Sequence, residues 1–173
     1  MSAAKPETAK STGVELFAEG VPLYELSIVR IFDAPRALVY EAFSKPEHIK
    51  QWMGPRAFTA THFEQDARPG GRWRACLRQI GDWHGRTYPD LWQGGVFKEI
   101  VPPERIVYTF AWEGGGLPTR EMLITIRFIA LDSHRTEMHF HQKFFDSVEQ
   151  RDSHNEGWNS SFDRLNDYVK QNV

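Results

Sequence analysis

Apolar and polar residues alternate with a period of two through most of the chain from Phe58 to Phe144. This period is typical of strands that turn one face to a core and the other to water. Turn-forming groups such as Pro69-Gly70-Gly71 and Gly114-Gly115-Gly116 separate the alternating segments. The connections are too short for the crossovers of parallel strands, so the pattern predicts an antiparallel sheet. The predicted strands are 58–65, 72–80, 91–100, 105–111, 120–131 and 135–144.

A strand and two short helices are predicted ahead of this series. The strand covers 23–32, and Asp33 follows it as a candidate N-cap with Pro35 in the first helical turn. Ser44 is the candidate N-cap of the second helix, which is predicted over 46–51.

A long amphipathic helix is predicted at the C-terminus, over 146–171. Trp158, Phe162, Leu165 and Val169 recur every three or four residues on one face. The order of elements predicts an α+β fold in which a curved sheet wraps around this helix. A straight helix touches a curved sheet mainly along one line, so we expect a tapered cavity beside the line of contact.

The chain of 173 residues suits a single domain over 21–173, preceded by a small, polar stretch over 1–20 that we expect to be a flexible tail. The sequence contains no apolar run long enough for a membrane span and no basic-then-apolar leader, so we expect a cytoplasmic protein. The net charge of −2 is scattered along the chain, which argues against a nucleic-acid partner. Its single cysteine, Cys76, excludes an internal disulfide.

Five motifs carry a resemblance to a known family. They are Phe32-Asp33-Ala34-Pro35 with 39–43, Pro46-Glu47-His48-Ile49-Lys50-Gln51-Trp52-Met53-Gly54-Pro55, the glycine-pair turn in 66–74, the hairpin 94–106, and Gly157-Trp158 with Phe162 and Leu165. In this order and spacing the chain resembles the START-like (SRPBCC) superfamily, and within it the bacterial homologues of the activator of heat-shock protein 90 ATPase. The resemblance implies a helix-grip fold over about 23–170 and suggests a link to the stress response.

The resemblance leaves the function open, because one fold serves many chemistries. Three hypotheses follow: a binding module for a small, largely apolar or aromatic ligand, an enzyme of cyclase or hydrolase type that uses the same pocket, and a co-chaperone-like domain that stimulates an ATPase. The enzyme hypothesis predicts a carboxylate or histidine with a shifted pKa inside the cavity. A homodimer and a protein partner are both compatible with the sequence.

Aromatic residues are unusually frequent, with 6 Trp, 12 Phe and 5 Tyr, and this favours a ring-lined cavity over a minimal core. Strand alternation and helix spacing select the candidate ligand-binding residues. They are Trp52, Met53, Trp73, Leu77, Tyr108, Phe110, Trp112, Met122, Ile124, Met138, Phe140, Gln142, Trp158 and Phe162. Any one of them can equally be ordinary core.

Gln142 is the one polar member of this set. A buried amide needs hydrogen-bond partners, and a ligand, Tyr108 or the backbone are the candidates. Phe144 is predicted to share its inward face, and Cys76 to alternate outward with the neighbouring arginines, where a nucleophilic role is not expected.

No metal or cofactor site is predicted. His139 and His141 lie on the face predicted to be solvated, and no cysteine or carboxylate cluster completes a zinc-like set. The nearest candidates for acid–base chemistry are Asp66, His84, Tyr88, Asp90 and Glu99, which fall at strand ends or in loops and are explained as solvated turn residues. The sequence contains no nucleophile elbow, phosphate loop or dinucleotide fingerprint.

Two further features are singled out. The aromatic loop 81–90 is long for a hairpin, so it is either a lid over the cavity or a clamp that packs Trp83 on a neighbour. Gly157 lies inside the last helix, where glycine costs about 1 kcal/mol against alanine, and we expect it to allow a close approach or a bend.

Overall fold

The structure is a computed structural model and describes residues 15–16 and 22–172. The strands are β1 (Glu15–Leu16), β2 (Pro22–Phe32), β3 (Phe58–Gln65), β4 (Arg72–Gln79), β5 (Leu91–Val101), β6 (Arg105–Trp112), β7 (Met122–Ala130) and β8 (Thr136–Phe145). The helices are α1 (Arg36–Ser44), α2 (Pro46–Trp52) and α3 (Val148–Gln171). Of the residues predicted to form a flexible tail, only Glu15 and Leu16 lie within the described part, where they pair with the start of β2.

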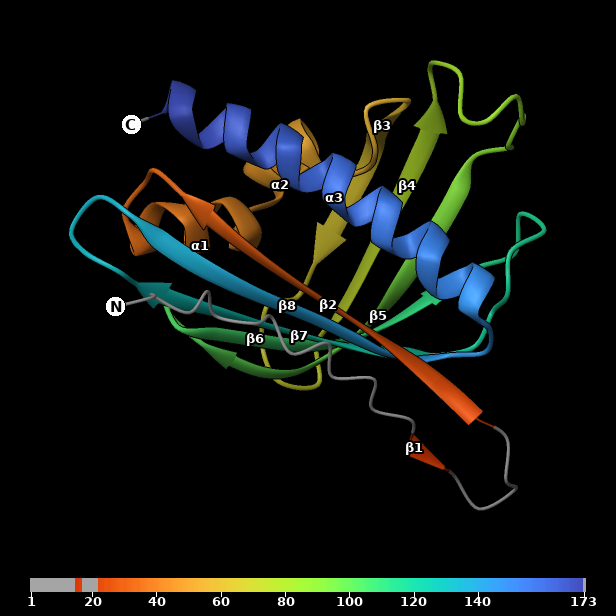
Figure 1. Cartoon of the computed structure of the whole chain (residues 1–173), viewed down its shortest axis with the longest axis horizontal. Coiled ribbons are helices and arrows are strands. Elements are labelled where there is room, and N and C mark those ends of the chain that lie inside the picture. The colour runs from red at the N-terminus through yellow and green to blue at the C-terminus, as the bar shows by residue number, and fades with distance from the viewer. Residues whose placement is uncertain (1–14, 17–21, 173) are drawn as a thin grey trace, which may run out of the picture.

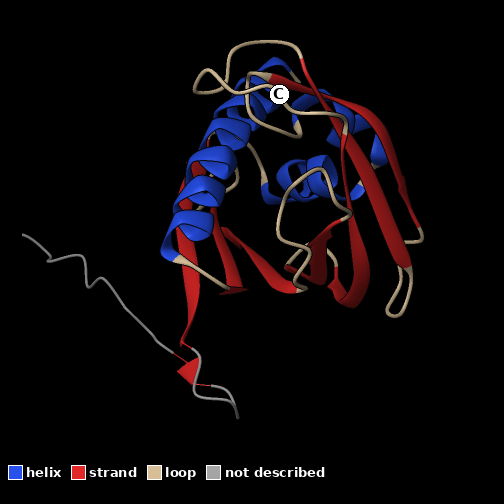
Figure 2. Cartoon of the chain, turned by 90° about the vertical axis from the view of Figure 1, so that its right-hand side faces the viewer, coloured by secondary structure: helices blue, strands red, loops and turns tan. Residues whose placement is uncertain are grey.

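The strands form one antiparallel sheet in the order β1-β2-β8-β7-β6-β5-β4-β3. Figure 1 shows α3 crossing this sheet, with α1 and α2 beside its C-terminal half. Figure 2 shows how the sheet curves around the helices. The predicted α+β architecture, with two short helices after a first strand and a long terminal helix, is confirmed.

Helix starts differ from the predicted caps. The N-cap of α1 is Pro35 rather than Asp33, and it makes no side-chain capping bond. Ser44 ends α1 instead of capping α2, because its hydroxyl donates back to the carbonyl of Glu41 at 3.3 Å. The start of α3 is capped by Ser147, whose hydroxyl accepts the N–H of Gln150 at 3.1 Å. Sequence periodicity predicts that a helix is present, but the residue that caps it depends on where the preceding element ends.

A bulge at the end of β8 reverses one predicted side-chain direction. Phe144 has φ of 81°, and the pairing with β2 shifts register between Tyr24 and Glu25. The extra residue turns Phe145 into the core, where it is fully buried, in place of the predicted Phe144.

The main core lies between the concave face of the sheet and the helices. Met122, Ile124, Ile126 and Phe128 of β7 are all buried, as alternation predicts. The ring of Phe128 packs on Phe43 of α1, with ring centres 5.3 Å apart. The apolar side of α3 completes the core with Phe162, Leu165 and Val169, which are at most 1% exposed. No helix in the described part of the chain has the length and apolar content of a membrane span.

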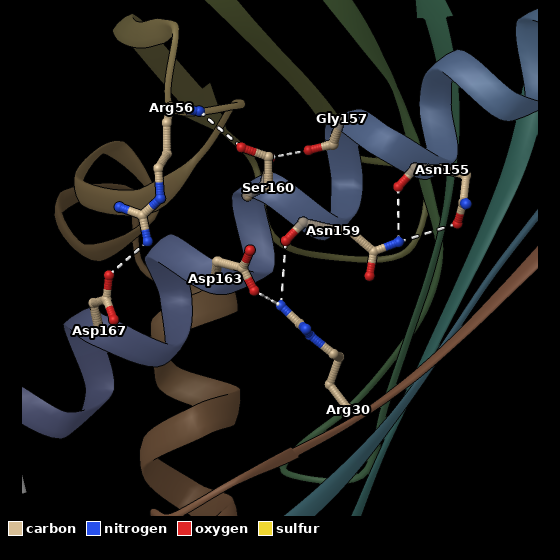
Figure 3. A network of polar contacts seen from close by, with 9 residues as sticks. Arg30, Arg56, Asn155, Gly157, Asn159, Ser160, Asp163 and Asp167 are labelled. Carbon is tan, nitrogen blue, oxygen red and sulfur yellow. Dashed lines mark hydrogen bonds and ion pairs between the residues drawn. The ribbon is translucent and has the colours of Figure 1, made fainter.

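Polar contacts fix α3 at both of its edges (Figure 3). On one side the guanidinium of Arg30, in β2, donates to Asp163 and to the carbonyl of Asn159. On the other side the backbone N–H of Arg56 donates to the hydroxyl of Ser160, and its guanidinium lies 2.7 Å from Asp167. The position of α3 over the sheet is therefore set from both flanks.

Arg164 adds a clamp between α3 and the segment that follows α2. Its Nη1 lies within hydrogen-bond distance of four backbone carbonyls, those of Met53, Gly54, Pro55 and Phe58. Burial lowers the pKa of Arg164 below its usual range. Because a guanidinium stays protonated even so, the clamp keeps its charge at all working pH values.

Candidate functional site

A cavity of about 360 Å³ lies beside the N-terminal half of α3. The helix backbone packs closely on β2, β8, α1 and α2, and stands away from β4, β5 and β6. The space left between helix and sheet is this cavity, and its volume falls within the range of about 300–1,000 Å³ that is usual for small-molecule sites.

Three walls enclose the cavity. The sheet contributes Leu77, Leu91, Gln93, Phe110 and Trp112. The helix contributes Ser147, Glu149, Gln150, Ser153, His154, Gly157, Trp158 and Ser161. The third wall is made by loops and the first residue of β3 and consists of Met53, Gly54, Pro55, Phe58, Trp83, Tyr88, Leu117 and Pro118. Rings and aliphatic chains dominate the surface, with a few polar groups from α3 and β5.

Four of the side chains at this cavity and beneath it form a directional hydrogen-bond network. Trp112 Nε1 donates to His154 Nε2 at 3.0 Å. His154 Nδ1 lies 3.2 Å from Gln142 Oε1, and Trp158 Nε1 donates to the same oxygen at 2.8 Å. Gln142, which is fully buried, thus accepts from two α3 side chains, and its Nε2 lies 3.5 Å from Met122 Sδ. Within residues 22–172 neither Tyr108 nor the backbone is a partner of its side chain.

The network fixes the protonation state of His154. Its Nε2 accepts from an indole N–H and so carries a lone pair, while its Nδ1 carries the proton that the Gln142 oxygen accepts. Burial lowers the pKa of His154 from 6.5 to about 4. His154 is therefore neutral at pH 7, and both of its ring nitrogens are engaged.

A second, smaller cavity of about 40 Å³ lies on the far side of Met53 and Trp158, which line both spaces. Its other walls include Trp52, Trp73 and Tyr108. The Tyr108 hydroxyl makes no hydrogen bond to any residue in 22–172, and burial raises the pKa of Tyr108 above its usual value. Met53 and Trp158 thus act as a partition between a large and a small chamber.

The fourteen candidate residues divide into three groups by position. Met53, Leu77, Phe110, Trp112 and Trp158 line the large cavity. Trp52, Trp73 and Tyr108 line the small one. The remaining six lie in the core below both and line neither: Met122, Ile124, Met138, Phe140, Gln142 and Phe162. The five strand residues face the concave side as predicted, and Phe162 faces them from α3. The ring of Phe140 lies only 4.6 Å from that of Trp158 and 5.3 Å from that of Phe162, which leaves no open space there.

The polar residues of the site that sequence reasoning missed include Gln93, Gln150 and His154. A signal for the two α3 residues was present, because 150, 154, 158 and 162 continue one helical face at intervals of four. Gln93 was hidden because its neighbour Trp92 is the more apolar residue, so composition favours the wrong face of β5.

The five residues considered for acid–base chemistry are mostly engaged at the surface. Asp66, Asp90 and Glu99 form ion pairs with Arg68, Arg78 and Arg105. His84 pairs with Glu156 of α3 at 2.8 Å. Tyr88 alone lines the cavity. Within residues 15–16 and 22–172 no group of three or more His, Cys, Asp or Glu is placed to hold a metal ion.

The thiol of Cys76 is buried, contrary to its predicted exposure. Its neighbours on the adjacent strands are His62 and Trp92, whose rings lie 5.4 Å apart across β4 and so close over the thiol. The guanidinium of Arg74 stacks on Trp92, 3.9 Å from the ring centre. A small patch of side chains on the outer face therefore shields a position that alternation alone assigns to water.

The aromatic loop over 81–90 lies at the cavity. Trp83 and Tyr88 both line it, and each ring centre is 6.1 Å from that of Phe58. The ion pair between His84 and Glu156 ties the loop to α3. The loop packs Trp83 on a neighbour, as one of the two alternatives has it, and the other alternative, a lid over the cavity, stays a prediction.

Gly157 is not required by close packing. A Cβ added there would meet its nearest neighbour, Pro55 Cγ, at 3.7 Å, which is an ordinary contact. We therefore expect Gly157→Ala to raise stability by up to about 1 kcal/mol through helix propensity, a rise in Tm of about 2–4 °C for a chain of this size. Thermal unfolding followed by circular dichroism measures the change.

Gly70→Ala is the matched control for this substitution. Gly70 has open space around it but a φ of 83°, so alanine there is strained and Tm should fall. A fall in Tm for Gly157→Ala as well would show that the helix needs glycine for its backbone shape.

Comparisons with known proteins identify the family and support the fold. A family model described as Activator of Hsp90 ATPase homolog 1-like protein matches residues 33–170. A solved structure from Rhizobium leguminosarum is 28% identical, with a TM-score of 0.70, over 86% of this chain and 95% of that chain. One from Chromobacterium violaceum is 26% identical, with a TM-score of 0.69, over 84% and 96%. An AHSA1 protein from Silicibacter pomeroyi is 18% identical, with a TM-score of 0.73, over 86% and 99%. No curated protein matches the chain.

Proposed function

The chain belongs to the family of Activator of Hsp90 ATPase homolog 1-like proteins, and from this premise we propose that it binds a small, largely apolar or aromatic molecule in the cavity between the sheet and α3. The observation that carries the proposal is the cavity itself, about 360 Å³ of space walled by rings and aliphatic chains. Burial of apolar ligand surface there contributes about 25 cal/mol per Å². Trp112 and Trp158 add ring faces for stacking, and hydrogen bonds hold both indoles in place.

The arrangement of His154 favours binding over catalysis. An enzyme that uses this pocket needs a titratable group with a free position toward the ligand. His154 meets the requirement of a shifted pKa inside the cavity, but both of its nitrogens are bonded to protein side chains. In this proposal His154 holds the side chains of Trp112 and Gln142 in place through its two hydrogen bonds.

Thermal unfolding against a panel of small molecules tests the proposal. The panel contains sterol, flavonoid, polyketide and fatty-acid analogues. A ligand present at a hundred times its dissociation constant stabilises the native state by about 2.7 kcal/mol. For a chain of this length the expected rise in Tm is about 5–10 °C.

Two tryptophan substitutions in α3 separate binding in the cavity from binding elsewhere. Ser153→Trp places a large ring in the cavity wall and should abolish the shift. Asp152→Trp adds the same ring at a neighbouring exposed position outside the wall and should leave it intact. If no compound shifts Tm, or if both variants respond alike, the proposal fails and the co-chaperone-like alternative gains.

A further inference from the structure

Two glutamine amides at the cavity have a nitrogen without a hydrogen-bond partner. Gln93 is 2% exposed and Gln150 is 9% exposed, and both line the cavity. The Nε2 of each is closed off from water and unpartnered. Buried polar groups are nearly always paired, because a buried donor without a partner has lost its hydrogen bonds to water and gained none in return. The wall therefore contains two hydrogen-bond donors that have no acceptor within the described protein.

The orientation of the Gln150 amide is set by its surroundings. Its Oε1 accepts the backbone N–H of Asp146 at 3.0 Å, so its Nε2 is the free end. Gln93 makes no hydrogen bond through either end of its amide to any residue in 22–172. Its last side-chain torsion has only broad preferences, so the amide is free to exchange the positions of its nitrogen and oxygen when a ligand offers an acceptor.

Both amides flank the Trp112–His154 pair. Gln93 lies directly opposite Trp112 on the neighbouring strand. Gln150 lies one helical turn before His154 on the same face of α3. The two side chains therefore border the same part of the wall, so one edge of a ligand can address both once each amide nitrogen turns toward the cavity.

The charges around the cavity point to a neutral ligand. Its lining contains no lysine or arginine, and its one carboxylate, Glu149, is at the exposed start of α3. His154 is neutral because burial lowers its pKa to about 4. An anionic ligand would leave water without a compensating cation, which is costly in an apolar site.

We propose that the ligand class of this cavity is a neutral aromatic carbonyl compound, such as an aryl ketone, quinone or lactone, whose oxygen accepts hydrogen bonds from Gln93 and Gln150. This inference rests on the proposed function and adds to it the polar group that the ligand carries. The ring system stacks against Trp112 and Trp158, and the carbonyl edge satisfies the two amides.

Three matched probes test the inference by titration of tryptophan fluorescence. They are 2-acetylnaphthalene, its isostere 2-isopropenylnaphthalene, in which CH₂ replaces the carbonyl oxygen, and 2-naphthoate. The ketone should bind about tenfold more tightly than the alkene, and the carboxylate more weakly than both. Gln93→Leu and Gln150→Glu, which keeps the acceptor for Asp146 but removes the donor, should each lower the ratio of ketone to alkene affinity several-fold.

The stability of Gln93→Leu is an independent readout. Because no hydrogen bond to this amide is lost, its Tm should equal or exceed that of the parent protein. Equal affinities of ketone and alkene for the parent protein, or an unchanged ratio in both variants, would overturn the inference and leave the proposed function standing. If none of the three probes binds and the small-molecule panel gives no shift in Tm, the inference and the proposed function are both overturned. If Gln93→Leu does not fold, Gln150→Glu still decides the question.

Discussion

Gln142→Met should lower the free energy of unfolding by about 2–4 kcal/mol, although methionine has a similar size and is apolar. The Gln142 oxygen accepts from Trp158 Nε1 at 2.8 Å and from His154 Nδ1 at 3.2 Å. Removing it leaves two donors inside the protein without an acceptor, and each costs about 1–3 kcal/mol. The lower end of the sum applies because water entering the cavity can reach part of the Trp158 indole. Urea unfolding at pH 7.5 measures the loss.

A double-mutant cycle with Trp158→Phe separates this cause from simple misfit of methionine. Phenylalanine keeps a ring on Phe140 but removes the indole N–H, so one of the two donors is gone before Gln142 is changed. In that background Gln142→Met should cost at least about 1 kcal/mol less than in the parent protein. Equal costs in both backgrounds would mean that the hydrogen bonds at Gln142 do not determine its contribution.

Acidification from pH 7 to pH 4 should destabilise the protein by up to about 3 kcal/mol through His154 alone. Burial lowers the pKa of His154 from 6.5 to about 4 in the folded state. The unfolded chain therefore binds a proton between these values that the folded chain does not bind. Stability from this source is fully present above pH 6.5, falls with decreasing pH by up to 1.36 kcal/mol per pH unit, and is lost near pH 4. Protonation of Nε2 would also make it a donor that faces the indole N–H of Trp112, so the hydrogen bond between the two rings would be lost.

His154→Gln isolates this contribution. A glutamine amide can accept from Trp112 and donate to Gln142, but it does not titrate. The pKa of Asp90 is held low by Arg78, and the pKa of Asp132 by the backbone N–H of His134. Protonation of these two carboxylates destabilises the parent protein and the variant equally, so it cancels in the comparison. The difference between the two stability curves should be flat above pH 6.5 and slope between pH 6.5 and 4. Parallel curves throughout that range would mean that His154 titrates normally in the folded state.

The residues that line the cavity show where sequence patterns succeed and where they stop. Phe110 and Trp112 were placed on the inner face of β6 by alternation, and Trp158 on the inner face of α3 by helical spacing. Those patterns follow from local backbone geometry, which repeats every 2 or 3.6 residues. Gln93 followed the same rule, but the stronger apolar signal of Trp92 concealed it. Phe144 broke the rule, because a bulge inserted one residue into β8.

The polar network illustrates contacts that no local pattern encodes. His154 lies 42 residues from Trp112 along the chain, and their bond exists only because α3 crosses above β6. Sequence reasoning gave Gln142 three possible partners and did not include Trp158 or His154. Cys76 is similar, since its burial depends on side chains from β3 and β5 that meet above it.

By itself the sequence determined the order of strands and helices, the antiparallel sheet, the apolar face of α3 and the family, because hydrophobic periodicity and turn residues act over a few positions. The tertiary structure decided which inward-facing residues reach open space and which lie under α3. It also decided which polar groups find partners, leaving the amide nitrogens of Gln93 and Gln150 without one. Both outcomes depend on the angle and height at which the helix crosses a curved sheet. Contacts between distant segments set this angle and height, among them the Arg30–Asp163 ion pair and the hydrogen bonds of Arg164 to the loop after α2.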